Sequence, residues 1–325
     1  MSSGFLPFDL PTDEASGPEW RRQFEEWRQQ IAECERKPSR GRVHALRVAT
    51  LRLQAQLEYW LPPGKPGDPA TRAARRWDRQ ARKLRRALSP VRAADVYVEK
   101  LARLRESAAE GTEGQPQCSR SCLRQIGKLE ERFARQRQQA ARRLRTEFEV
   151  RRERLIRLSR DLEAALEAPG LRDARHGAVA LKDMISRLRV EFPELNGETL
   201  HAFRKRVKAA RYLAEVTAET DPVAQRQAAT LSRMQAAAGE WHDWDVLAQK
   251  AARTRRKRES KGGAAELLET LATKSLKRAL NECARLTTRL MRHGTEHGAP
   301  SAPLPQKLPV GSVRPQAARA EKKSA

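Results

Sequence analysis

The stretch 118–167 constrains the fold more than any other part of the sequence. Its apolar residues recur every three or four positions, as at Ile126, Leu129 and Phe133, and this spacing is typical of one helix face. Ala168-Pro169-Gly170 ends the stretch. From Arg135 to Arg143 the stripe thins to alanines, so we expect the second half of this helix to be exposed to solvent or bent. No run of β-branched residues alternates with polar ones, and the sequence therefore predicts an all-α fold.

The other helices follow from the same periodicity and from Pro- and Gly-rich breaks. One is expected between Gly41 and about Leu61, and Ser89-Pro90 is expected to end one helix and begin the next. The remaining predicted helices are 18–36, 69–88, 90–110, 172–191, 199–219, 222–240, 242–260 and 264–293.

A row of cations lies on the helix predicted within 199–216. At about 100° per residue, one stripe of this helix collects four basic residues, namely His201, Arg204, Lys208 and Arg211. Lys205 and Tyr212 flank the stripe, while apolar residues occupy the opposite side. The nearest acid is Glu215, one turn beyond Arg211. Because a solvated helix face normally mixes both signs of charge, this stripe indicates an anionic partner.

The composition points to the same kind of partner. The chain has 66 Lys and Arg against 41 Asp and Glu, a formal net charge of +25. Such an excess favours a polyanion, which leaves nucleic acid, an anionic membrane surface or a phosphate polymer.

The two halves of the chain repeat each other. RVHALRVATLRLQAQLEYW aligns with TLHAFRKRVKAARYLAEVT, so that His44 matches His201 and Arg47 matches Arg204. Further on, RKLRRALSPVRAADV aligns with SRMQAAAGEWHDWDV, where Asp95 matches Asp245. A repeat of this length predicts two tandem, pseudo-symmetric helical bundles.

The first copy of the cationic stripe is weaker than the second. Leu51 and Gln54 stand at the positions of Lys208 and Arg211, while His44 and Arg47 remain on the stripe and Arg52 lies to one side. If both copies face one site, the second copy supplies most of its charge.

These motifs resemble the paired histidine and arginine helices of CHAD domains (conserved histidine α-helical domains). The family pattern is close to H-x-x-R-V-x-x-R-R-L-R in the first half and L-H-x-x-R-x-x-x-K-x-x-R-Y in the second. VHALRVATLRLQ resembles the first pattern, and LHAFRKRVKAARYLAE resembles the second. The resemblance to the family as a whole covers roughly residues 18–292. The resemblance implies helical bundles around a basic central groove that binds inorganic polyphosphate. The sequence has no Gly-rich phosphate loop, no serine or cysteine nucleophile motif and no paired carboxylates at a plausible site, so we expect neither catalysis nor a cofactor. The residues that the resemblance assigns to the groove are His44, Arg47, Arg52, His201, Arg204, Lys208, Arg211 and Tyr212. Lys205, which flanks the stripe, is predicted to bind polyphosphate with them.

The predicted domain organisation is a flexible N-terminus at 1–17, a CHAD domain at 18–293 and a disordered basic tail at 294–325. Within the domain, the first bundle is 18–168 and the second 171–293. The N-terminus lacks the features of a signal peptide, and no apolar run is long enough to span a membrane. A cytoplasmic location is expected, and the resemblance allows an association with polyphosphate granules.

Two other functions remain open at this level. The basic run from Lys250 to Lys261, with the tail, favours nucleic-acid binding. His242-Asp243 is typical of metal-dependent phosphohydrolases, which need further His and Asp ligands. Otherwise Asp243, Asp245 and Asp95 are expected to form ion pairs with the cations of the two stripes.

The four cysteines, Cys34, Cys118, Cys122 and Cys283, are few and scattered. We expect them to be reduced thiols, with no zinc site.

Overall fold

The computed structural model describes residues 19–61, 68–109, 118–167, 174–218, 221–254 and 263–295. These residues form helices throughout, with no strand among them, which confirms the predicted all-α class. The helices are α1 (Glu19–Arg36), α2 (Arg40–Trp60), α3 (Pro69–Ala109), α4 (Arg120–Leu166), α5 (Ala174–Glu191), α6 (Leu200–Thr217), α7 (Pro222–Thr254) and α8 (Ala264–Thr295).

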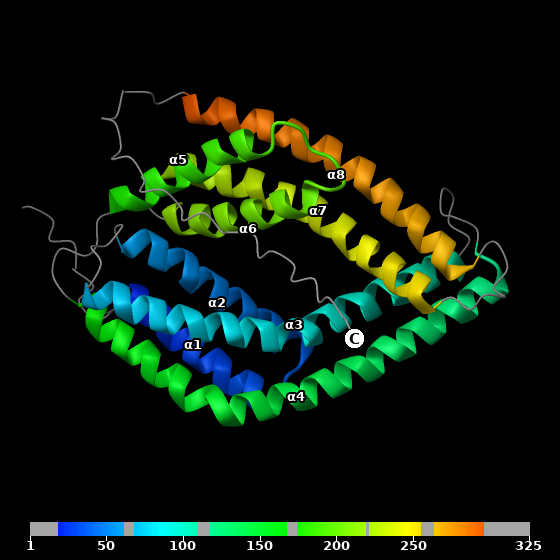
Figure 1. The fold of residues 1–325 in the computed structure, drawn as a ribbon, viewed down its shortest axis with the longest axis horizontal. Helices are drawn as coiled ribbons and strands as arrows, with labels where there is room; N and C mark the ends of the chain where they lie inside the picture. The colour runs from blue at the N-terminus through cyan, green and yellow to red at the C-terminus, as the bar shows by residue number, and fades with distance from the viewer. Residues whose placement is uncertain are drawn as a thin grey trace, which may run out of the picture.

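Two groups of helices lie against each other along α2 and α6, and each has its own core (Figure 1). The first core combines α1, α2, the beginning of α3 and the end of α4. At its centre the ring of Trp77 packs edge-on against Phe24 and Trp27, with ring centroids 6.0 and 5.4 Å apart. The second core is built by α5, α6, α7 and α8 around residues such as Phe203 and Leu286.

A third core joins the two groups at the far end of the long helices. It brings together the end of α3, the beginning of α4, the end of α7 and the beginning of α8, which converge at the right of Figure 1. Leu101, Ile126, Leu247 and Leu268 are buried in it. The side-chain Oε1 of Gln125 also accepts a hydrogen bond of 2.8 Å from the backbone N–H of Ala264. The halves therefore share apolar surface, which the repeat in the sequence did not predict.

Two predicted helix breaks are wrong. α3 runs through Pro90 without interruption. Its neighbours Leu88 and Val91 are fully buried, and this burial offsets the hydrogen bond that proline cannot donate. α7 (Pro222–Thr254) likewise continues through 240–242, because Ala238 and Trp241 are buried in the second core and Leu247 is buried in the third core.

Of the two alternatives predicted for the far half of α4, exposure is wrong, whereas the ribbon of α4 bends near its label in Figure 1. Leu144, Phe148, Leu155 and Leu162 are buried in the first core. The alanines between Arg135 and Arg143 mark a thin part of the stripe that resumes afterwards.

The cysteine prediction is wrong for one pair, since Cys118 and Cys122 form a disulfide. Cys118 precedes the N-cap Ser119, and Cys122 lies in the first turn of α4. Their Cα atoms are 5.6 Å apart, within the range that a disulfide spans. Cys34 and Cys283 are free and buried.

Several predictions concern residues outside the described ranges. These are the flexible segment 1–17, most of the tail 294–325, and the part of the 250–261 run that follows Thr254. In the ranges that are described, no helix is both long and apolar enough to cross a bilayer.

Candidate functional site, a basic groove between three helices

α6 separates apolar from cationic residues around its circumference. Phe203, Val207, Ala210 and Leu213 are fully buried in the second core. The opposite side packs beside α2, so its cations face the first half of the chain. An amphipathic helix thus presents charge to a neighbouring helix as well as to water.

The cations of α6 open onto a groove of about 720 Å³ between α2, α3 and α6. Among the described residues, seven basic side chains line it, and Asp78 is the single acid. The basic residues are Arg47, Arg75, Arg82, Arg85, Arg204, Lys205 and Lys208. Asp78 already accepts a hydrogen bond from Gln54 and pairs with Arg82 at 2.7 Å. The groove is therefore strongly cationic.

The sequence-based prediction missed the contribution of α3. Arg75, Arg82 and Arg85 form the wall opposite α6. A signal was present, because residues 72–92 contain nine Lys and Arg and only one acid, Asp78. It was overlooked because α3 has no counterpart of the histidine and arginine motif.

Two guanidinium groups reach the groove with a buried N–H that has no protein partner. Among the described residues, the Nε atoms of Arg85 and Arg204 are buried without a hydrogen bond. Arg47 differs, because it donates to the hydroxyl of Ser89 at 2.8 Å and to the carbonyl of Arg85 at 3.2 Å. In the repeat, Arg204 matches Arg47 and Gly239 matches Ser89, so the second half lacks that hydroxyl. Buried donors are normally satisfied, and an anion in the groove would satisfy these two.

Lys208 lies at the centre of this positive field. Burial, together with the charges of Arg47, Arg204, Arg211 and Arg85, lowers its pKa from 10.5 to about 7. Desolvation and like charge both disfavour the ammonium form. A bound anion would reverse the second effect.

Tyr212 is the aromatic residue among the described side chains that line the groove, and only 3% of it is exposed. The guanidinium of Arg211 lies 4.3 Å from its ring centroid, and the ammonium of Lys208 lies 5.9 Å away. These are cation–π distances. The ring therefore supports the cations and presents no open face for a stacked base.

Arg211 and Arg52 do not line the groove, because both are held by Glu215. Arg211 donates to Glu215 at 2.6 Å and to Gln235 at 2.9 Å. Arg52 approaches the other carboxylate oxygen at 3.6 Å. With His44, Arg52 and Glu215 line a separate hollow of about 650 Å³ between α1, α2 and α6. The structure therefore places three predicted site residues, Arg211, Arg52 and His44, beside the groove.

His201 faces α7, where its ring centroid lies 4.9 Å from that of His242. Burial and the charges of Lys205 and Arg204 lower the pKa of His201. For His242, burial and the charges of Arg204, His201 and Lys205 lower the pKa to about 4. Burial lowers the pKa of His44 as well, helped by Arg92 and Lys208.

The aspartates that were predicted to form ion pairs with the cations of the two stripes do so only in part. Asp243 lies in the field of Lys100 and Arg204, although burial raises its pKa. Asp245 accepts from Gln249 at 2.9 Å. Asp95 pairs with Arg137 of α4 at 3.0 Å, so the predicted pairing with the first stripe is wrong. Because Asp95 is buried beneath α4, it reaches that helix instead of α2.

No group of three or more His, Cys, Asp or Glu side chains that could hold a metal ion occurs in the described part of the chain. His242 and Asp243 thus have no further metal ligands of these types there.

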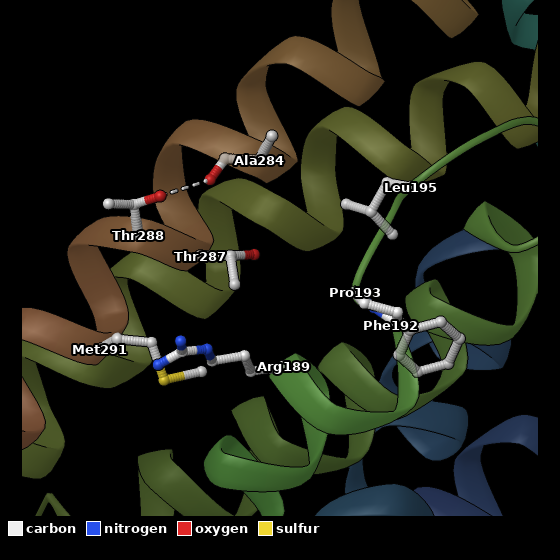
Figure 2. A pocket seen from close by; sticks show the side chains of 8 residues that line it. All are labelled: Arg189, Phe192, Pro193, Leu195, Ala284, Thr287, Thr288 and Met291. Carbon is white, nitrogen blue, oxygen red and sulfur yellow. Dashed lines mark hydrogen bonds between the residues drawn. The ribbon is translucent and has the colours of Figure 1, made fainter.

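A different kind of hollow, of about 570 Å³, lies between the end of α5 and α8 (Figure 2). Its lining is mostly apolar, with Phe192, Leu195 and Met291, and Arg189 is its single charged residue. A concentration of cations like that of the α2–α3–α6 groove is therefore not found in every hollow of the described structure.

Comparison with known proteins decides the family. The family model described as the CHAD domain matches residues 19–252, which is most of the chain. This protein belongs to the CHAD domain family. That family is linked in general to polyphosphate binding. The match includes α2, α3 and α6, which form the groove.

Two solved structures share this CHAD fold. The CHAD domain from the plant Ricinus communis is 17% identical and superposes with a TM-score of 0.54, covering 87% of this chain and 91% of that one. PptA from Streptomyces chartreusis is also 17% identical, with a TM-score of 0.50 and coverage of 85% and 99%. At this identity the likeness concerns the fold alone. No curated protein sequence matches the chain significantly.

Proposed function

We propose that this CHAD protein binds inorganic polyphosphate in the groove between α2, α3 and α6 and does not catalyse a reaction. We further propose that it acts in the cytoplasm, at polyphosphate granules. The observation that carries the proposal is the convergence of seven cations from three helices against one neutralised acid. Polyphosphate is a flexible chain with a charge on each phosphate. Arginines bind phosphate through paired N–H groups and lysines as point charges.

The groove fits a polymer of phosphates better than a nucleic acid. Proteins that bind single strands stack bases on exposed aromatic rings. Among the described side chains that line the groove, the one aromatic ring is Tyr212, which is buried. Phosphate contacts alone need no such ring, and the unpartnered Nε–H groups of Arg85 and Arg204 are suited to anionic oxygens.

The experiment compares long-chain polyphosphate with duplex and single-stranded DNA at two salt concentrations. We expect tighter binding of polyphosphate at both, with affinity falling as salt rises because counterions are released. DNA binding as tight as that of polyphosphate at the higher salt would contradict the proposal.

A double charge reversal locates the site. Arg204→Glu with Lys208→Glu should weaken polyphosphate binding by about 100-fold, because charge-assisted hydrogen bonds are worth about 1.5–3 kcal/mol each. The reversal relieves repulsion among cations, so helicity should persist in circular dichroism. Lys274→Glu with Lys277→Glu, on the exposed face of α8, is the matched control and should change affinity much less. Equal losses in both variants would indicate attraction by net charge alone.

A further inference from the structure

A second basic hollow, of about 590 Å³, lies on the other side of α3, against α4. Lys83 and Arg86 of α3 and Arg143 of α4 line it, together with the amides of Gln136 and Gln139. Its single acid, Glu147, is hydrogen-bonded to Arg151. Among the described residues, no carboxylate forms an ion pair with Lys83, Arg86 or Arg143.

The alanine-rich part of α4 explains why the two helices leave a hollow here. Ala140 of α4 lies opposite Ala87 and Pro90 of α3. Small side chains on both helices cannot fill the space between them, whereas Leu144, one turn later, closes the core again. The thinning of the apolar stripe between Arg135 and Arg143 therefore shapes a surface feature.

The cations of α3 form a continuous belt from the groove to this hollow. With Arg82 taken as zero and about 100° per residue, Arg85 lies at about −60°, Arg86 at about 40° and Lys83 at about 100°. Arg85 lines the groove, whereas Arg86 and Lys83 line the hollow. Arg82 lies between them in angle and also lines the groove. Arg82, Arg86 and Lys83 are exposed. An extended polyanion can therefore cross α3 and remain close to basic side chains along its whole path.

We propose that the hollow between α3 and α4 is a second polyphosphate subsite, reached only by long chains that first occupy the groove and then cross α3. This inference rests on the proposed function and extends it to chain length. A short oligomer fills one site, whereas a long chain bridges both. Linking two sites through one ligand raises affinity without any new kind of contact.

The test compares tripolyphosphate with long-chain polyphosphate. The neutralising variant is Lys83→Gln, Arg86→Gln and Arg143→Gln, and the matched control removes three exposed cations of α8 by Lys274→Gln, Lys277→Gln and Arg278→Gln. We expect the first variant to bind long chains about tenfold more weakly and to lower the slope of log affinity against log salt by about 2, as for three lost phosphate contacts. Its affinity for tripolyphosphate should equal that of the control.

Other outcomes overturn the inference in distinguishable ways. Equal long-chain affinities for the two triple variants would leave the groove as the whole site. A parallel loss of tripolyphosphate binding would make the hollow part of the groove. Loss of DNA binding in place of long-chain binding would assign the hollow to nucleic acid. Failure of the unaltered protein to bind either phosphate ligand would overturn the proposed function as well.

Discussion

At the scale of single residues, the two copies of the motif arginine have different surroundings. Arg47 is satisfied by Ser89 and by a backbone carbonyl. Arg204 retains a buried N–H without a partner among the described residues. The hydroxyl that accepts from Arg47 Nη1 belongs to Ser89, and the matching position of the second half is Gly239. We therefore expect Arg204 to contribute more to anion binding than Arg47.

The lowered pKa of Lys208 makes anion binding depend on pH. Its pKa is 10.5 in the unfolded chain and about 7 in the folded protein, so between these values the unfolded chain holds more protons. This group's contribution to stability therefore rises with pH across that window. A bound polyanion favours the ammonium form. The complex thus takes up a proton above about pH 7, and affinity falls as pH rises.

We expect polyphosphate affinity to fall by about tenfold between about pH 6.5 and about pH 8.5. Lys208→Arg should flatten this dependence, because arginine stays charged throughout. Burial and neighbouring cations lower the pKa values of His44 and His201, and both shifts favour the neutral imidazole. Isothermal titration at several pH values measures the effect, and an unchanged slope in the variant would assign it to other groups.

Glu215 restrains two predicted site residues, Arg52 and Arg211. Glu215→Gln should strengthen polyphosphate binding about three- to tenfold, because it frees both cations and removes a negative charge near the ligand. The same change leaves the mostly buried Arg211 without its ion pair and should lower the unfolding free energy by about 1–2 kcal/mol. Titration and urea denaturation check the two effects, and weaker binding would show that Arg211 must be held in place.

At the scale of helices, the sequence predicted where helices occur better than it predicted whether a helix continues without a break. Periodicity located α2, α4 and α6 because each has one long buried stripe. It failed at Pro90 and near Gly239 because the local preference of these residues is outweighed by burial against other helices. No local pattern carries that information.

Pro90 should still carry the cost of its missing hydrogen bond. Pro90→Ala restores a donor to the carbonyl of Arg86 and should raise the unfolding free energy by about 1–3 kcal/mol. Urea midpoints measure the gain. A lower midpoint would indicate that the packing of α3 on α4 requires the proline conformation.

At the scale of the molecule, the site was predictable only in part. The repeat placed α2 and α6 together, and Arg47, Arg204, Lys205 and Lys208 line one groove with Tyr212. Two features depend on tertiary contacts, which spacing along a helix does not encode. They are the wall of the groove that α3 supplies and the ion pairs with Glu215 that hold Arg52 and Arg211 outside the groove. The third core was missed for the same reason, since it forms between helix ends that are distant in sequence.

The third core should couple the stability of the two halves. Leu268 is fully buried there, and Leu268→Ala should cost about 2–5 kcal/mol. We expect hydrogen exchange to accelerate at the joined ends of α3, α4, α7 and α8 together. Leu290→Ala, equally buried but in the second core, is the control and should leave the end of α3 protected. Acceleration confined to α7 and α8 after Leu268→Ala would mean that the halves unfold independently.

The division of the groove between the halves has a consequence for the free protein. Arg47, Arg75, Arg82 and Arg85 come from one side, and Arg204, Lys205 and Lys208 from the other. Without a bound anion, these cations of the two halves repel each other across the groove, and this repulsion destabilises the contact between the halves. A ligand that binds only the folded state stabilises it by mass action. Under the proposed function, phosphate polymers would become part of what holds the two halves together, and the melting temperature should rise with the amount of polymer bound.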